Sequence, residues 1–208
     1  MFIDAEVYSE LYLKDKSEES IRSEIEKLRD EISKIKERAE NPLVEPDPLE
    51  YPAAHDTVAL YREYMNKASA ALMALTGDDG LTEEEKSARY VDSFICEIRR
   101  ISLTVGVELQ EKYVLTVGDN FTSLSRCVGG ECENTEPSRE RAISVLEALH
   151  MGEWRDRYSV EDFGMLVGDT FSWELKVEYR GSSAPRTYTG KGMFPYNFRL
   201  LARLLSVN

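Results

Sequence analysis

The side chains of this chain that could do chemistry are three cysteines, two histidines and many carboxylates. Cys127 and Cys132 are four residues apart, and two thiolates at that spacing could bind zinc. A structural zinc site needs four ligands, and Cys96, His55 and His150 are scattered through the sequence. We therefore expect no metal and no cofactor, and we interpret the pair as two small residues at a strand end. A disulfide or redox pair is geometrically possible but would need an oxidising setting.

Carboxylates and arginines gather in one segment that has no clear period. The acidic residues are Glu153, Asp156, Glu161 and Asp162, and the basic ones are Arg155 and Arg157. Catalytic groups favour loops held on a rigid scaffold, so a metal-dependent hydrolase or nuclease using these carboxylates is one alternative. A surface salt-bridge network explains them more simply, because metal and general-base sites normally bring a more specific pattern.

Nucleophilic catalysis has little support in the sequence. We find no Gly-x-Ser-x-Gly elbow, and Gly190-Lys191-Gly192 lacks the strand-to-helix context of a phosphate-binding loop. His150 lies at the C-terminal end of a predicted helix, where its side chain would interact favourably with the negative end of the helix dipole. We therefore expect a protein that is not an enzyme.

The charge of the chain is negative and unevenly distributed. The 208 residues include 26 Lys and Arg against 39 Asp and Glu, for a net charge of −13. Residues 1–100 hold 14 basic and 24 acidic side chains, a balance of −10. Nucleic-acid binding depends on cationic groups that displace counterions, so we expect no direct nucleic-acid contact and favour a basic protein partner.

The sequence predicts no membrane partner and a cytoplasmic location. No apolar stretch reaches the roughly 20 residues of a membrane span. Residues 1–6 lack the basic flank and apolar run of a secretory signal. An odd number of cysteines also fits a reducing compartment better than a disulfide framework.

Three amphipathic helices are expected in an acidic arm covering residues 1–100. The first, at about 17–40, begins at Ser17 and has an apolar seam that alternates four and three: Ile21, Ile25, Leu28, Ile32 and Ile35. The second spans about 53–75, beyond a proline-rich connector at 41–52. Thr82 and Glu85 form a capping box for the third, at about 82–100. The matching periods of the first two predict a helical hairpin.

From residue 101 the period changes to two, which predicts an α+β domain over 101–208 with a mostly antiparallel sheet and two packed helices. We expect strands near 101–109, 113–117 and 121–128, a polar loop at 131–137 and a helix from Ser138 to about His150. Residues 153–169 are expected to be irregular, with Trp154, Tyr158, Phe163 and Leu166 as apolar anchors. Two more strands and a closing helix complete the domain.

The last strands and helix share a distinctive pattern, which reads Trp173, Leu175, Val177, Tyr179, Tyr188, Gly190, Phe194, Pro195, Asn197 and Phe198. This stretch resembles the C-terminal end of a family of small, mostly uncharacterised bacterial proteins, many of them on mobile elements. The turn at 180–184 is longer and less acidic than the Asp-Gly usual in that family. The resemblance implies an α+β module, and it implies no activity, substrate or catalytic residue.

These observations together predict a non-enzymatic interaction protein that works through its acidic helical surface. The mobile-element resemblance suggests a phage or mobile-element inhibitor of a nucleic-acid-handling bacterial defence protein, comparable to an anti-CRISPR protein. The expected binding residues are Glu18, Glu19, Glu24, Glu26, Asp30, Glu31, Glu37 and Glu40. A third alternative is a structural homodimer that pairs through the Ile25 and Ile32 seam.

Overall fold

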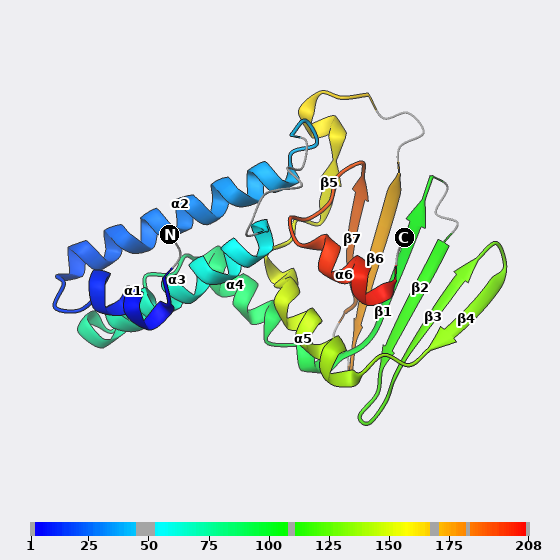
Figure 1. Ribbon diagram of the computed structural model, residues 1–208, viewed down its shortest axis with the longest axis horizontal. Helices are drawn as coiled ribbons and strands as arrows, with labels where there is room; N and C mark the ends of the chain where they lie inside the picture. The colour runs from blue at the N-terminus through cyan, green and yellow to red at the C-terminus, as the bar shows by residue number, and fades with distance from the viewer. Residues whose placement is uncertain (1–2, 45–52, 108–110, 167–170, 182–183, 207–208) are drawn as a thin grey trace. The chain divides into compact units, whose positions relative to one another are not determined.

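A computed structural model describes residues 3–44, 53–107, 111–166, 171–181 and 184–206 (Figure 1). Contacts within the chain divide it into two compact units, Met1–Lys86 and Ser87–Asn208. The first unit is helical and the second contains a seven-stranded sheet, so the fold class is α+β, as the change of period predicts. The division falls inside the third predicted helix, 14 residues before the boundary expected at residue 100.

The helical unit contains α1 (Ala5–Tyr12), α2 (Glu18–Glu40) and α3 (Ala54–Thr76), followed by the start of α4 (Glu83–Asp92). The bounds of α2 and α3 agree with the predicted helices, and α1 is an addition. Ser17 caps α2 as expected, because its hydroxyl accepts from the backbone N–H of Ser20 at 3.3 Å. Of the predicted connector at 41–52, residues 45–52 lie outside the described residues.

The apolar seam of α2 packs within the chain. Ile21, Ile25 and Leu28 are buried in a core with Ala68 and Leu72 of α3. Two tyrosines from different helices complete this core, because the rings of Tyr8 and Tyr64 stack with centroids 4.0 Å apart. A heptad-like seam therefore predicts the partner helix correctly, while the tyrosine pair depends on α1.

The third helix is shorter than predicted. α4 ends at Asp92, a 3-10 turn covers Ile95–Glu97, and β1 (Ile98–Gly106) begins where a helix was expected. The pairing of β1 with β6 is irregular between Ile98 and Arg100, which leaves Ile98 and Ile101 buried on one face although they are three residues apart. The bulge gives two buried strand residues the three-residue spacing that is typical of a helix. The hydrophobic period of the sequence therefore predicts a helix wrongly at this place.

The sheet of the second unit has the strand order β4-β3-β2-β1-β6-β7-β5. The remaining strands are β2 (Glu111–Val117), β3 (Thr122–Val128), β4 (Glu131–Thr135), β5 (Arg157–Ser159), β6 (Ser172–Tyr179) and β7 (Arg186–Lys191). All neighbours are antiparallel except β5 and β7. Helices α5 (Arg139–Leu149) and α6 (Phe198–Leu205) both lie on one face (Figure 1).

Two tryptophans whose indole N–H groups are hydrogen-bonded connect this sheet to the segments that pack on it. The indole N–H of Trp173 donates to the carbonyl of Met193 at 2.7 Å. The indole N–H of Trp154 donates to Asn197 Oδ1 at 3.0 Å, and the amide of Asn197 in turn donates to the carbonyl of Leu149 at 2.6 Å. A buried Trp needs such a partner, so the Trp and Asn of the C-terminal pattern have a structural role.

Three expectations for this unit are wrong. Residues 131–135 form strand β4 and not a polar loop. The 153–169 segment, of which residues 167–169 lie outside the described residues, contains β5 and a 3-10 turn at Val160–Phe163. Trp154 and Tyr158 are buried as predicted, but Phe163 and Leu166 are exposed, Leu166 at 98%. β4 is exposed along its whole length and β5 has three residues, so neither carries the burial pattern that reveals a strand.

Cys127 and Cys132 are also placed differently from the expectation of two independent small residues. They lie directly opposite each other on β3 and β4, and their sulfur atoms form a disulfide. Cys96 is a free, exposed cysteine. Among the described residues, no group of three or more His, Cys, Asp or Glu side chains is arranged to hold a metal ion.

Candidate functional site

The outward face of α2 carries a continuous stripe of small and acidic residues. Six exposed positions follow each other at steps of four and three residues: Glu19, Ser23, Glu26, Asp30, Ser33 and Glu37. At about 100° per residue these side chains share one face, and the buried isoleucines occupy the opposite face. We call these six residues the acidic stripe. It contains four of the eight carboxylates predicted to bind a partner.

The four carboxylates of the acidic stripe are not in ion pairs with the part of the chain that the structure describes. Glu19 and Glu37 are 18 residues apart, which corresponds to about 27 Å of helix. Charges on the exposed face of a helix normally gain from partners three or four residues away. Basic residues do stand at such positions, for example Arg29 three residues after Glu26, and the charges of Glu26 and Asp30 act on Arg29. None of these basic residues forms an ion pair with the four carboxylates, which can therefore meet an external cation.

The other four predicted residues are occupied within the chain. Glu18 binds Arg22 at 2.9 Å, and Glu31 binds Lys34 at 2.8 Å. Glu24 accepts a 2.6 Å hydrogen bond from the Tyr8 hydroxyl, and Glu40 is only 8% exposed. The structure thus brings Glu19, Glu26, Asp30 and Glu37 onto one surface, and it does not bring the other four there.

The Tyr8–Glu24 contact ties α1 to α2. Burial and the neighbouring Glu24 carboxylate together raise the pKa of the Tyr8 hydroxyl far above its usual range. Tyr8 therefore stays protonated and keeps donating to Glu24 throughout the physiological range of pH. The sequence predicted Glu24 as a surface residue that contacts a partner. Its spacing of three residues from Lys27 indicates an ion pair on the helix surface and does not reveal the bond to Tyr8.

Basic side chains border the acidic stripe without entering it. Helix α2 contains eight acidic and six basic residues, so its net charge is 6 − 8 = −2. Lys27 and Lys34 lie along one side of the stripe at 100° per residue, and Arg22 and Arg29 lie along the other. The face is therefore strongly acidic because charges are segregated, and not because the helix has a large net charge.

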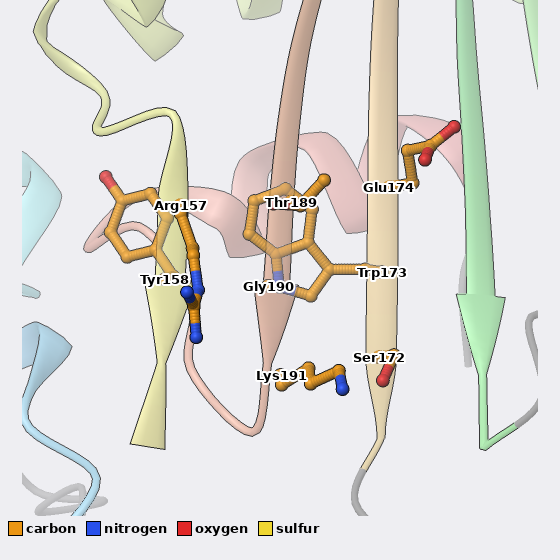
Figure 2. Close-up of a pocket in the computed structure, with 8 residues that line it drawn as sticks. All are labelled: Arg157, Tyr158, Ser172, Trp173, Glu174, Thr189, Gly190 and Lys191. Atoms are coloured by element: carbon orange, nitrogen blue, oxygen red, sulfur yellow. The ribbon is translucent and has the colours of Figure 1, made fainter. Parts of the chain in front are cut away.

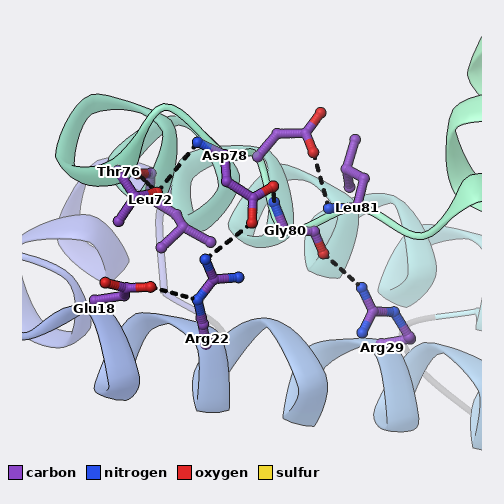
Figure 3. A network of polar contacts seen from close by, with 9 residues as sticks. Glu18, Arg22, Arg29, Leu72, Thr76, Asp78, Gly80 and Leu81 are labelled. Atoms are coloured by element: carbon purple, nitrogen blue, oxygen red, sulfur yellow. Dashed lines mark hydrogen bonds and ion pairs between the residues drawn. The ribbon is translucent and has the colours of Figure 1, made fainter.

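Arg22 and Arg29 are turned toward the loop that joins α3 to α4 (Figure 3). Arg22 binds Asp78 at 2.9 Å, and the Nη2 atom of Arg29 donates to the carbonyl of Gly80 at 3.1 Å. Backbone N–H donation from Gly80 and the Arg22 guanidinium lower the pKa of Asp78. These contacts hold the basic border of the stripe away from the stripe itself.

A capping box supports the same loop. The backbone N–H of Glu85 donates to the Thr82 hydroxyl at 3.1 Å, and Glu85 Oε2 accepts from the N–H of Thr82 at 2.8 Å, as the sequence predicts. Arg29 also binds both carboxylate oxygens of Glu85, at 2.8 and 2.9 Å. Burial alone would raise the pKa of Glu85, but the bonds from Arg29 and Thr82 hold it below its usual value.

Among the described residues, the carboxylates of residues 153–162 are not part of any group of three or more His, Cys, Asp or Glu side chains that could hold a metal ion. Glu161 binds Arg157 at 2.5 Å, and the main-chain carbonyl of Asp156 accepts from Thr189 at 3.0 Å. A pocket of about 260 Å³ lies beside this segment, over β5, β6 and β7 (Figure 2). Its charged lining residues are Arg157, Glu174 and Lys191, which do not include the predicted catalytic carboxylates.

No protein-family model, curated protein or solved structure matches the chain. Within the described residues, no helix is long and apolar enough to cross a membrane.

Proposed function

We propose that this protein is a non-enzymatic interaction protein whose contact surface is the acidic stripe of α2. The observation that carries the proposal is the set of four exposed carboxylates, Glu19, Glu26, Asp30 and Glu37, that have no ion-pair partner among the described residues. A partner with matching cationic side chains would gain electrostatic attraction without breaking any contact inside this chain.

The partner we favour is a basic, nucleic-acid-handling protein of bacterial defence. In this proposal the chain is a phage or mobile-element protein that binds and inhibits this partner in the cytoplasm. The resemblance of residues 173–205 to mobile-element proteins motivates this choice. Carboxylates spread over about 27 Å are much sparser than the phosphates of a duplex, which present one charge per about 1.7 Å. The acidic stripe would therefore engage a few arginines or lysines of a phosphate-binding groove and would not replace a whole duplex.

The experiment is a binding titration against purified candidate nucleases of bacterial defence, repeated at low and high salt. The variant Glu26→Lys with Asp30→Lys places two cations in the centre of the stripe, and we expect the affinity to fall at least about tenfold. The matched control is Glu10→Lys with Glu63→Lys, which makes the same charge change at exposed positions on α1 and α3.

Two results would count against the acidic stripe. The first is equal loss of binding in the stripe variant and its control, which would mean that net charge alone attracts the partner. The second is an affinity that stays constant between low and high salt, because contacts between exposed charges weaken as salt screens them.

The two alternative functions lack a supporting observation. The hydrolase would need the carboxylates of residues 153–162 to face a common ion, and Glu161 instead binds Arg157. The homodimer would need an open seam on α2, yet Ile25 and Ile32 are 2% and 7% exposed in this single chain. Titration with magnesium and manganese tests the hydrolase, and light scattering tests the dimer.

A further inference from the structure

The hairpin of β3 and β4 ends in a disulfide at the edge of the sheet. Gly129 and Gly130 form its two-residue turn, both with positive φ, which only glycine adopts easily. Val128 pairs with Glu131, and the next pair along the hairpin is Cys127 and Cys132, whose sulfur atoms are bonded. β4 is the last strand of the sheet on this side, so no other strand of the described residues covers it.

The two sulfurs of this disulfide have different surroundings. Cys132 is exposed on the edge strand, whereas Cys127 is partly buried between β2 and β4. Attack on a disulfide requires access to one sulfur. An incoming thiolate therefore reaches the sulfur of Cys132 first, and Cys127 becomes the leaving group.

Groups that stabilise a departing thiolate lie on the side of Cys127. Lys112 of β2 is its direct cross-strand neighbour, so the two side chains share the face of the sheet that is turned away from α5 and α6. The hydroxyl of Ser125 lies 3.9 Å from the Cys127 sulfur. The sequence neighbours of Cys132 are two carboxylates, Glu131 and Glu133, which disfavour a thiolate there.

Lys112 is free for this role. It is exposed and forms no ion pair with the described residues. A cation beside a thiolate stabilises it, and the better stabilised thiolate leaves faster from a disulfide. The row Lys112, Cys127, Cys132 thus runs from a cation to an accessible sulfur across three adjacent strands.

We propose that the Cys127–Cys132 disulfide is a reversible exchange site for a low-molecular-weight thiol, with Cys132 as the attacked sulfur and Cys127 as the leaving thiolate. In the first step the small thiolate bonds to Cys132 and the bond between the cysteines breaks, which leaves Cys127 as a thiolate. In the second step another small thiolate attacks the bound small thiol and forms the small-molecule disulfide. Cys132 then leaves as a thiolate, and the protein has gained two electrons.

Exchange at this site changes the edge of the sheet. None of the five residues of β4 is buried, so packing against the core does not hold the strand in place. Once the disulfide opens, β4 stays docked through its pairing with β3 and the two-glycine turn. The hairpin then becomes the part of the sheet that frays most easily, and the edge of β3 becomes available.

The test uses the full chain with Cys96→Ser, because Cys96 is a free, exposed cysteine that would also react. The oxidised protein is mixed with reduced glutathione, and the appearance of protein thiols is followed over time. We expect Lys112→Glu to slow exchange at least about threefold and Lys112→Arg to keep the rate within about twofold. Lys191→Glu makes the same charge reversal on the same face at β7, and it should leave the rate unchanged.

Two further readouts decide the direction of attack and its effect on the strand. Mass mapping of the trapped intermediate should find glutathione on Cys132, and hydrogen exchange should rise in residues 131–135 after reduction while residues 111–117 stay protected. Glutathione on Cys127, an unchanged rate in a folded Lys112→Glu protein, or a disulfide that millimolar glutathione leaves intact would overturn the proposal. Circular dichroism of each variant confirms that the rates compare folded proteins.

Discussion

Gly190 lies directly beneath the indole ring of Trp173, its register partner on β6 (Figure 2). A Cβ atom at this position would approach Trp173 Nε1 to 2.2 Å and the carbonyl of Met193 to 2.7 Å. Those two atoms are hydrogen-bonded to each other, so a methyl group cannot enter without breaking the bond. The glycine of the C-terminal pattern is therefore required by packing and not by the flexibility of a turn.

Replacing Gly190 by alanine should destabilise the second unit by about 3 kcal/mol, since the methyl group overpacks the core and displaces a buried indole. Denaturant titration followed by tryptophan fluorescence measures the loss. Thr189→Ala, one residue earlier with its side chain on the opposite face, should cost less than about 1 kcal/mol. Equal losses in the two variants would contradict this account of Gly190.

Glu85 makes the stability of the helical unit depend on pH. Its folded-state pKa is below the ordinary value of 4.5, so the contribution to stability is complete above that value and is lost as pH falls through the folded-state pKa. We expect Glu85→Gln to cost about 1–2 kcal/mol at pH 7 and progressively less below pH 4. Thermal unfolding at several pH values checks this, with the exposed Glu84→Gln as the control that should stay near wild type.

At this scale the sequence predicts local contacts better than distant ones. The capping box of Thr82 and Glu85 follows from a spacing of three residues, and it is present. The bond from Arg29 to Glu85 joins residues 56 positions apart, and no periodicity relates them. The same limit explains why eight carboxylates were predicted as one surface, while Glu18, Glu24, Glu31 and Glu40 have partners or burial within the chain.

Elements with one buried face were predictable, and elements without one were not. The alternation of Ile101, Leu103 and Val105 identified β1, and these residues are buried. β4 has five exposed residues and β5 has only three residues, so hydrophobic periodicity contains no information about either strand. Neither the strand order nor the parallel pairing of β5 with β7 could be derived, because both depend on contacts between distant segments.

Helix α6 closes the core of the second unit, and its inward residues Phe198, Leu201, Leu204 and Leu205 are buried as predicted. Leu201 is fully buried, so Leu201→Ala should remove about 2–5 kcal/mol of stability through lost transfer energy and a new cavity. Leu200→Ala removes the same atoms from a partly exposed neighbour and should cost less than half as much. Urea unfolding of both proteins compares them, and similar costs would mean that α6 packs differently.

On the scale of the whole molecule, acidic charge is concentrated in the helical unit. Residues 1–86 contain 11 basic and 22 acidic side chains, which gives −11, and residues 87–208 contain the remaining 15 and 17, which gives −2. The acidic stripe belongs to the first of these compact units, and the β3–β4 hairpin with its disulfide belongs to the second. We therefore expect added salt to weaken partner binding at the acidic stripe. Substitutions in the stripe should leave the rate of thiol exchange at the hairpin largely unchanged.

The two units also contain different spectroscopic probes, which makes their independence measurable. Both tryptophans, Trp154 and Trp173, lie in the second unit, while α2 and α3 supply most of the helical signal. Ile25→Asp puts a charge into the buried seam of α2. An unpaired buried charge should lower the free energy of unfolding of the helical unit by several kcal/mol, and the midpoint of the helical transition should fall with it. The tryptophan transition should keep its midpoint if the units unfold separately. A shift of both transitions together would mean that the chain unfolds as one cooperative body.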